Sequence, residues 1–322
     1  MQPPSPTVTD AAPPLVSVIV PTYNCAAYID ETVASVLAQT HPAVELIVID
    51  DGSTDGTLER LAAWGPRLTV VPQANAGVCA ARNHGLRIAR GEFVCLLDHD
   101  DYWFPDKLAV QVAALQARPE VGVVYGSFMP WQRPAEGAAF PSPASLDRSA
   151  SGSGPDPAFS GWIYHQFLLD CWMLTSSAMF RASVFRDCGL FDETLPYSED
   201  WELWLRISRR HPFLKLREVH TLYRQHRQQG NRVVRPVDYR TELLQRTAHR
   251  WGLASADGRQ VSESAFRQQL ARYHVEFGLS HLAGGSRRIG LQSMLKALRA
   301  CPWRVKPAAY MLAATLGWKP AV

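Results

Sequence analysis

The sequence predicts an α/β fold with a mostly parallel central sheet and helices on both of its faces, followed by a helical C-terminal region. Short apolar runs alternate with helix-like segments from Val16 to about residue 126, a pattern that is typical of βαβ units. The runs are apolar at nearly every position, as in strands that are buried on both faces. Clusters of polar residues follow several runs, at the edge of a parallel sheet where ligands bind.

The first half of the chain is expected to contain five strands and the helices between them. Each expected strand is a run such as "VSVIV" or "VELIVID", and each helix is a longer segment such as "DKLAVQVAALQA". The strands are expected at 16–20, 44–50, 68–71, 92–97 and 121–126, and the helices at 28–39, 56–64, 77–89 and 106–117.

The composition changes after residue 128. Residues 129–160 are rich in Pro, Ser, Gly and Ala, and so long a segment in a compact domain predicts a mobile loop. The pattern resumes with a helix at 161–170, a strand at 175–180, a helix at 198–210 and either one long strand or a strand pair at 213–226. We therefore divide the chain into a disordered Pro-rich lead-in (1–15), a first half (16–128), the loop (129–160), a second half (161–235) and a C-terminal helical region (236–322) with breaks at 252–258 and 283–288.

The overall composition is that of a globular protein. The 322 residues carry a formal net charge of +3, which gives no argument for a nucleic-acid partner. Arg and His crowd residues 206–250, as in a solvated basic face or a site for an anionic group. The six cysteines show neither CxxC pairs nor zinc-ligand spacing, so we expect reduced thiols in a cytoplasmic protein. The first fifteen residues lack the features of a signal peptide, and no apolar run approaches the roughly 20 residues that cross a bilayer.

The stretch "EFVCLLDHDDYW" ends an expected strand with Asp98, Asp100 and Asp101. Like charges this close disfavour one another's ionisation, and a hard divalent cation with oxygen ligands would relieve the repulsion. Residues two apart on an extended segment share a face, so Asp98 and Asp100 are expected to point into the crevice and Asp101 away from it. The segment predicts a site for Mn²⁺ or Mg²⁺ with Asp100 and Asp98 as ligands. A polar turn without a metal is the alternative.

The motifs "PTYN", "VIDDGSTD", "NAGVCAARN" and "LLDHDD" occur in this order, and together they resemble the family 2 glycosyltransferases over roughly residues 16–226. The family has the GT-A fold and uses nucleotide-diphosphate sugars. The resemblance implies that 16–128 is the nucleotide-sugar-binding half and that 161–235 is the acceptor and catalytic half. It implies a donor site made of Pro21, Thr22, Tyr23, Asn24, Asp50, Asp51, Gly77, Arg82, Asp98 and Arg224.

Several residues of this implied donor site have individual roles. Tyr23 would offer a stacking face to the base, and Asp50 or Asp51 would accept a hydrogen bond from it, as from a uracil N–H; we favour Asp51. Gly77 opens a helix whose free N–H groups suit a phosphate. Arg82 could reach the base or the phosphate. The donor is therefore expected to be UDP-linked.

The stretch "YSEDWELWL" is the expected catalytic site. In the family, a carboxylate at the "ED" position is the general base that removes the proton of the acceptor hydroxyl as its oxygen attacks the anomeric carbon. Either Glu199 or Asp200 fits, and the family pattern favours Asp200. Ser198 is the expected N-cap, and an acid in the first helical turn is favoured in its ionised form. An acidic first turn that only stabilises the helix is the alternative.

The resemblance also implies the course of the reaction. Attack opposite the leaving diphosphate inverts the anomeric centre and needs one base, while the cation stabilises the leaving group. Processive members carry a QxxRW motif and membrane spans, and neither is present in this sequence. Arg224 and His226 in "YRQH" instead resemble diphosphate-contacting residues of non-processive members, and His226 is also a candidate metal ligand.

The acceptor is expected to be a glycan or a lipid-linked sugar in cell-surface polysaccharide synthesis. A sugar-phosphate nucleotidyltransferase is a weaker alternative, because no Gly-rich basic loop follows the first strand. A non-catalytic nucleotide-sugar-binding module would be expected to have lost an acid from "DHDD" or "SED". Residues 286–306 mix basic and apolar side chains, which leaves open a peripheral contact with the inner face of the cell membrane, ordinary helix packing or a homo-oligomer.

Overall fold

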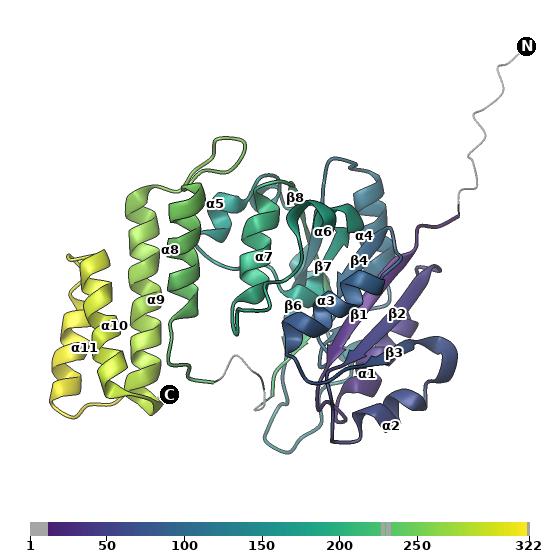
Figure 1. The fold of residues 1–322 in the computed structure, drawn as a ribbon, viewed down its shortest axis with the longest axis horizontal. Helices are drawn as coiled ribbons and strands as arrows, with labels where there is room; N and C mark the ends of the chain where they lie inside the picture. Colours follow the sequence, from purple (N-terminus) through teal and green to yellow (C-terminus); the bar gives the residue numbers. More distant parts are fainter. Residues whose placement is uncertain (1–11, 227–228, 230–232, 321–322) are drawn as a thin grey trace, which may run out of the picture.

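The computed structural model describes residues 12–226, 229 and 233–320. An eight-stranded sheet with helices on both faces forms one part of the molecule, and the helices after residue 238 extend it to one side (Figure 1). The expected α/β fold and the C-terminal helical region are confirmed. Residues 1–11 of the expected lead-in lie outside the described residues.

The sheet is mostly parallel, with the strand order β3-β2-β1-β4-β7-β6-β8-β5. β1 pairs in parallel with β2 and β4, β2 pairs in parallel with β3, and β6 pairs in parallel with β8. β7 runs antiparallel to both of its neighbours, β4 and β6, and β5 runs antiparallel to β8. The strands are β1 Val16–Thr22, β2 Val44–Asp50, β3 Thr69–Pro72, β4 Phe93–Leu96, β5 Tyr102–Trp103, β6 Val123–Trp131, β7 Ala178–Arg181 and β8 Phe213–Arg224.

Both faces of the sheet are buried under helices. Successive residues of a strand point to opposite faces. In β4, Val94 and Leu96 join a hydrophobic cluster with side chains of α3 and α5 to α9, whereas Phe93 and Cys95 join one with α1, α2 and α4. This explains why the strands are apolar at consecutive positions. The helices of the α/β domain are α1 Ile29–Leu37, α2 Thr57–Ala62, α3 Val78–Ile88, α4 Lys107–Gln116, α5 Tyr164–Phe167, α6 Ala182–Cys188 and α7 Glu199–Ser208.

The structure differs from the sequence prediction in a few elements. β6 continues to Trp131, beyond the expected start of the loop at 129, because its last residues pair with β8 and the Trp131 ring packs on Phe140. The strand β5 and the helix α6 were not predicted. The open choice at 213–226 is resolved, since β8 is one long strand.

The C-terminal region consists of α8 Tyr239–Trp251, α9 Glu263–Gly284, α10 Arg287–Ala300 and α11 Lys306–Thr315. The expected breaks at 252–258 and 283–288 fall between helices, and a further break at 301–305 was not predicted. Gly278 and Gly290 let α9 and α10 approach closely, since a Cβ on Gly290 would lie 3.0 Å from the Gly278 carbonyl oxygen. Among the described helices, none is long and apolar enough to cross a membrane.

Candidate active site

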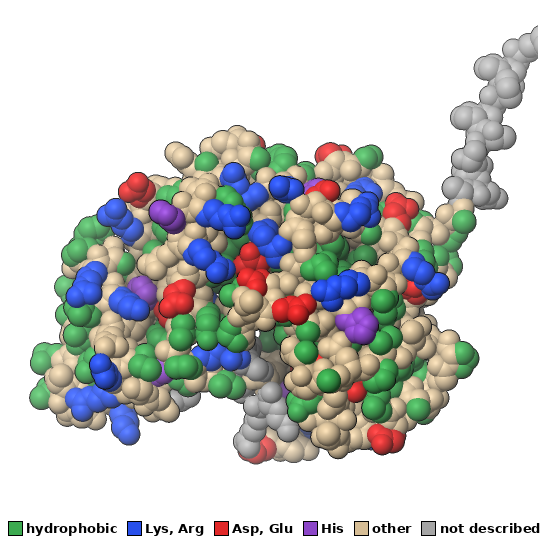
Figure 2. All heavy atoms as spheres, in the orientation of Figure 1, with side chains coloured by type: hydrophobic (Ala, Val, Ile, Leu, Met, Phe, Trp, Pro, Cys, Tyr) green, Lys and Arg blue, Asp and Glu red, His purple; other side chains and the backbone are tan. Residues whose placement is uncertain are grey.

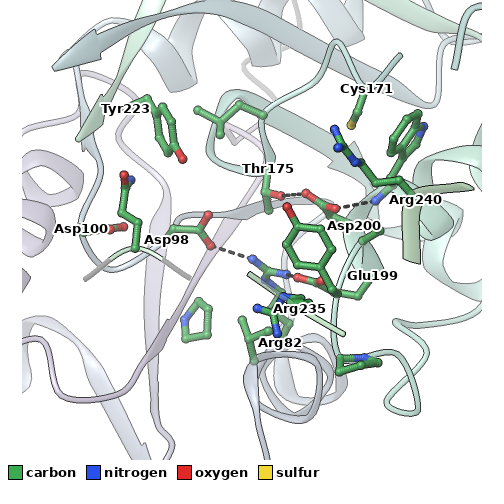
Figure 3. A pocket seen from close by; sticks show the side chains of 18 of the residues that line it. Arg82, Asp98, Asp100, Cys171, Thr175, Glu199, Asp200, Tyr223, Arg235 and Arg240 are labelled. Atoms are coloured by element: carbon green, nitrogen blue, oxygen red, sulfur yellow. Dashed lines mark hydrogen bonds and ion pairs between the residues drawn. The ribbon is translucent and has the colours of Figure 1, made fainter. Parts of the chain in front are cut away.

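A pocket of about 540 Å³ lies at the carboxyl ends of β1 and β4. One wall carries Asp98 and Asp100 from the segment after β4, and the opposite wall carries Glu199 and Asp200 from the start of α7 (Figure 3). Arg82 of α3 lies between the two walls. The topology therefore brings together acids that are about a hundred residues apart in the sequence.

Arg82 joins the two walls through a double ion pair. Its Nη2 donates to Asp98 Oδ1 at 2.8 Å and its Nη1 donates to Glu199 Oε1 at 2.9 Å (Figure 3). The Arg82 guanidinium is buried and lies over the Phe191 ring. Although burial opposes the charged form, the nearby Asp98 and Glu199 carboxylates raise the pKa of Arg82 above its ordinary value. Arg82 is thus a permanent cation that fixes both carboxylates.

Asp200 is held differently from Glu199. Its Oδ1 accepts a hydrogen bond from the Trp201 N–H at 2.6 Å, and its Oδ2 accepts a longer one from Thr175 Oγ1 at 3.4 Å. Burial raises the pKa of Asp200 to about 6, the Glu199 carboxylate acts in the same direction, and Arg82 opposes them. Burial thus outweighs the effect of the helix N-terminus on the pKa of Asp200. Asp200 is nonetheless mostly ionised at neutral pH.

The expected capping role of Ser198 is not supported. Ser198 precedes α7 at the N-cap position, but its side chain makes no capping hydrogen bond. Its backbone lies in the left-handed region, at φ 61°, where a residue other than glycine is uncommon. This conformation starts α7 at Glu199, so that both acids occupy the first turn.

The three aspartates of "DHDD" have three different partners. Asp98 pairs with Arg82, as described above, and Asp100 Oδ2 lies 2.8 Å from His226 Nε2. Asp101 is fully buried and points away from the pocket, where its Oδ2 accepts a hydrogen bond from Ser176 Oγ at 2.5 Å. Burial, together with Asp100 and Asp98, raises the pKa of Asp101 well above its ordinary value. The structure thus relieves the repulsion in part without any metal.

The wall that carries Asp98 and Asp100 could contribute ligands to a divalent cation. Asp98 and Asp100 both line the pocket and offer carboxylate oxygens, which Mn²⁺ and Mg²⁺ accept. Burial opposes the ionisation of Asp100, yet the hydrogen bond with His226 and the nearby His99 lower its pKa below the ordinary value. Within the described residues, no group of three His, Cys, Asp or Glu side chains could hold a metal.

Arg224 does not line the pocket, and its side chain is engaged with other parts of the chain. Its side chain is buried, and its Nε donates to the Asp100 carbonyl oxygen at 2.6 Å while its Nη2 donates to Glu31 Oε2 at 2.6 Å. Its backbone N–H donates to Asp101 Oδ1, and its guanidinium lies 4.0 Å from the Trp131 ring centroid. Arg224 therefore positions the "DHDD" segment from behind rather than lining the pocket.

The "PTYN" motif forms the turn after β1. Pro21 lines the pocket, whereas Tyr23 is about half exposed outside it. Asn24 adopts a left-handed conformation at φ 49°, and its Oδ1 accepts a hydrogen bond from the Thr54 N–H at 2.8 Å. This contact joins the turns after β1 and β2, so both motifs act as one structural unit.

Asp50 and Asp51 follow each other but serve different purposes. Asp51 accepts hydrogen bonds from the N–H groups of Ala76 at 2.9 Å and Gly77 at 2.8 Å, which orders the turn into α3. Asp50 pairs in register with Thr22, and its Oδ1 and the Thr22 hydroxyl are buried without a partner among the described residues. Gly77 has φ 90°, so this turn needs a glycine for its backbone conformation.

The pocket brings together only part of the expected site. Pro21, Arg82, Asp98, Asp100, Glu199 and Asp200 line it, whereas Thr22, Tyr23, Asn24, Asp50, Asp51, Gly77, Arg224 and His226 do not. Further lining residues were not predicted, because they lie far away in the sequence and belong to no motif. They include Asp170, Cys171, Arg235, Arg240 and Tyr273.

Comparison with known sequences gives a family and one informative relative. Residues 17–172 match the family model described as "Glycosyl transferase family 2". A putative teichuronic acid biosynthesis glycosyltransferase, TuaG of Bacillus subtilis, is 47% identical over 109 residues, which are 33% of this chain and 43% of TuaG. The chain covers 59% or less of the curated relatives that match over longer stretches.

Solved structures give the fold. S. aureus TarS in complex with UDP-GlcNAc has a TM-score of 0.60 at 21% identity, over 93% of this chain and 84% of the TarS chain. The mannosyltransferase PcManGT of Pyrobaculum calidifontis, in complex with GDP-Man and Mn²⁺, has a TM-score of 0.57 at 22% identity, over 97% of this chain and 84% of the other. The expected GT-A fold is confirmed by these neighbours. Over residues 17–172 the chain is similar to glycosyltransferase family 2.

Proposed function

We propose that the protein transfers a sugar from a nucleotide-diphosphate sugar, with UDP as the nucleotide, to a hydroxyl group of an acceptor, with inversion of the anomeric centre. The observation that carries this proposal is the Arg82 bridge. It joins Asp98, on the wall that carries the donor motifs, to Glu199, which precedes the candidate base. Donor-side and acceptor-side groups thereby share one pocket of about 540 Å³.

Asp200 is the proposed general base, with Glu199 as the other candidate. Glu199 is already paired with Arg82 at 2.9 Å, so its carboxylate is committed to a cation. The pKa of about 6 makes Asp200 a stronger base than an ordinary aspartate, yet one that is mostly deprotonated at neutral pH. One base suffices for an in-line displacement, in which Asp200 takes the hydroxyl proton and the diphosphate leaves with the electrons of the anomeric C–O bond.

Asp100 and Asp98 are the proposed metal ligands, with His226 either as a further ligand or as the group that orients Asp100. When bound, Mn²⁺ or Mg²⁺ would supply positive charge for the leaving diphosphate. Arg224 supports this arrangement because it holds the Asp100 carbonyl oxygen. The base, ribose and phosphate of the donor nucleotide are proposed to contact the motifs that follow β1 and β2 and precede α3. Their residues are Thr22, Tyr23, Asn24, Asp50, Asp51 and Gly77.

The acceptor is proposed to be a glycan or a lipid-linked sugar of the cell surface. The support is the teichuronic acid role that is ascribed to TuaG. The absence of a QxxRW motif from the sequence supports non-processive transfer. A nucleotidyltransferase has no supporting feature in the pocket, and a non-catalytic module is disfavoured because Asp98, Asp100 and Asp200 all line it.

A donor screen tests the proposal, because hydrolysis of the donor needs no acceptor. Nucleotide release from UDP-sugars and GDP-sugars is measured with Mn²⁺ and with a chelator, and we expect release from one UDP-sugar with Mn²⁺ only. Calorimetry with UDP should show that Asp100→Ala loses the dependence of binding on Mn²⁺, while the remote surface variant Asp257→Asn keeps it. A pure protein that releases nucleotide from no donor under either condition would argue against the proposed activity.

The same titration with UDP can decide whether Asp50 or Asp51 contacts the base of the nucleotide. Asp50→Asn and Asp51→Asn are compared for UDP affinity and for thermal stability. The variant that loses affinity at unchanged stability identifies the acid that binds the nucleotide. A variant that loses both identifies the acid that orders the turn.

A further inference from the structure

The outer face of α11 is apolar and exposed, in contrast to the other amphipathic helices. The inner face packs on α9 and α10 through Ala314 and the partly buried Tyr310 and Met311. Val305, Ala309, Leu312 and Leu316 follow one another at intervals of four, three and four positions, so they share the opposite face. We call these four residues the apolar stripe.

The residues of the apolar stripe are among the most exposed of the molecule. Val305 is 77%, Leu312 64% and Leu316 81% exposed, and Ala309 is also exposed. A soluble helix normally turns polar side chains to water, yet residues 307–318 contain no charged residue. Contiguous exposed apolar surface of this kind marks an interaction site.

Two tryptophans lie close to the ends of the apolar stripe. Trp303 precedes α11 and is 66% exposed, and Trp318 follows α11 and is 41% exposed. The Trp318 ring stacks on Tyr310, with the ring centroids 5.7 Å apart, so its position is fixed relative to the helix. Tryptophan is enriched at the boundary between lipid and water, where one side of the ring is apolar and the N–H is hydrated.

The charge around the apolar stripe is of one sign. No Asp or Glu follows Glu276 in the sequence, while Lys and Arg recur along α10, in the segment between α10 and α11, and at the two ends of α11. Figure 2 shows hydrophobic and basic side chains, and no acidic ones, at the lower left, where these helices lie in Figure 1. The basic residues are Arg287, Arg288, Lys296, Arg299, Arg304, Lys306 and Lys319.

We propose that the apolar stripe and the basic residues around it bind an anionic phospholipid surface, with α11 lying in the plane of the interface. Leu312 and Leu316 would enter the boundary between headgroups and acyl chains, while Lys306 and Lys319 contact lipid phosphates. A lipid surface fits better than a second copy of the chain, because two identical surfaces without acidic residues would bring like charges together.

This surface extends beyond the proposed function and does not depend on it. Along α11, the stripe from Val305 to Leu316 would span about 16 Å at 1.5 Å per residue, which suits an interfacial helix and is too short to cross a bilayer. None of its residues lines the pocket, so binding to lipid can be measured without donor or acceptor.

Co-sedimentation of the full chain with vesicles tests the proposal. We expect binding to vesicles of phosphatidylcholine mixed with phosphatidylglycerol, and much weaker binding to phosphatidylcholine alone or at high salt. Replacing Leu312 and Leu316 by Glu should lower the partition coefficient by about tenfold or more, because two apolar side chains and the charge match are lost. Leu58→Glu, at an exposed leucine of α2, is the matched control and should bind like the unchanged protein.

A second pair of substitutions examines the charges. Arg304→Glu with Lys306→Glu should reduce binding to the anionic vesicles and leave the circular dichroism spectrum unchanged. Equal binding to neutral and anionic vesicles would overturn the proposal, and so would full binding by the Leu312 and Leu316 variant. Sedimentation equilibrium tests whether the apolar stripe instead binds a second copy of the chain. The lipid proposal is overturned if the unchanged protein forms a dimer and does not bind vesicles, and if the Leu312 and Leu316 variant abolishes this dimer.

Discussion

Arg82 Nη1 lies 2.9 Å from Glu199 Oε1, although 117 residues separate the two in the chain. The contact crosses the pocket from α3 to α7 and is shielded from water on the arginine side, where the side chain is 5% exposed. A single cation thus determines the distance between the donor wall and the first turn of α7.

Replacing Arg82 by Met should destabilise the protein and change the titration of the base. The substitution leaves Asp98 and Glu199 without their cation, and breaking a buried pair of this kind costs about 3 to 5 kcal/mol. Urea unfolding measures this loss, and Arg60→Met serves as the control because the pair of Arg60 with Asp30 is about half exposed and should contribute less than about 1 kcal/mol. Since Arg82 also opposes the upward pKa shift of Asp200, any residual activity should require a higher pH. Unchanged stability would contradict the structural role.

Asp200→Asn should abolish transfer while donor binding survives. The carboxylate acts on the acceptor hydroxyl, and it is active only when it has lost its proton. With a pKa of about 6, the rate of the unchanged protein should fall tenfold per pH unit below about pH 6 and level off above it. Initial rates across this range, with UDP affinity from calorimetry as the control, check both statements. Near-normal transfer by Asp200→Asn with any accepted donor would exclude Asp200 as the base.

Asp200→Asn should make the folded protein more stable at neutral pH, although it abolishes transfer. A carboxyl whose pKa is higher in the folded than in the unfolded protein favours folding while protonated, and this contribution disappears as the pH rises from about 4 to about 6. Asp200→Asn keeps a neutral side chain there, so it should raise the free energy of unfolding at neutral pH by about 3 kcal/mol and change it little at about pH 4. Urea unfolding at both pH values decides this. If Asp200→Asn instead lowered the free energy of unfolding at neutral pH, the folded protein would stabilise the ionised Asp200 carboxylate, contrary to this prediction.

Arg224→Lys should weaken the metal dependence without removing the metal ligands. A lysine keeps the charge but lacks the planar guanidinium, whose Nε reaches the Asp100 carbonyl oxygen while its Nη2 reaches Glu31. Residues that orient a ligand typically change metal affinity by about 10- to 100-fold, so the Mn²⁺ concentration for half-maximal rate should rise, with a smaller change in the rate at saturation. A fall in the saturated rate alone, at unchanged Mn²⁺ dependence, would contradict the positioning role.

Much of the fold could be predicted from the sequence, because the strands β1 to β4 are continuous apolar runs and the helices between them are long. β5 is only two residues long and forms because β8 offers an edge for Tyr102 and Trp103. No local pattern marks so short a strand. β6 is longer than predicted for the same reason, since its last residues depend on pairing with β8 and not on their own composition.

The positions of the candidate site residues could be predicted where a motif follows a strand directly. The direction of a long side chain such as that of Arg224 could not. Asp98 and Asp100 line the pocket as expected, although not for the expected reason: the segment is a turn, in which the Asp101 N–H donates to the Asp98 carbonyl oxygen at 3.1 Å, and His99 lines the pocket too. Arg224 belongs to an equally suggestive motif, but its long side chain turns to the back of the "DHDD" segment. Which way such a chain turns depends on Glu31 and Trp131, from distant parts of the sequence.

β7 connects the two halves of the α/β domain by backbone hydrogen bonds, to β4 on one side and to β6 on the other. Asp98 and Asp100 follow β4, and α7 packs on β7 through the stacked rings of Phe180 and Trp204, so both walls of the pocket are attached to one continuous sheet. Bringing the base closer to the anomeric carbon by a rotation of halves would break this ladder. In the proposed reaction, the separation between Asp100 and Asp200 is therefore set by strand pairing and not by a swinging lobe.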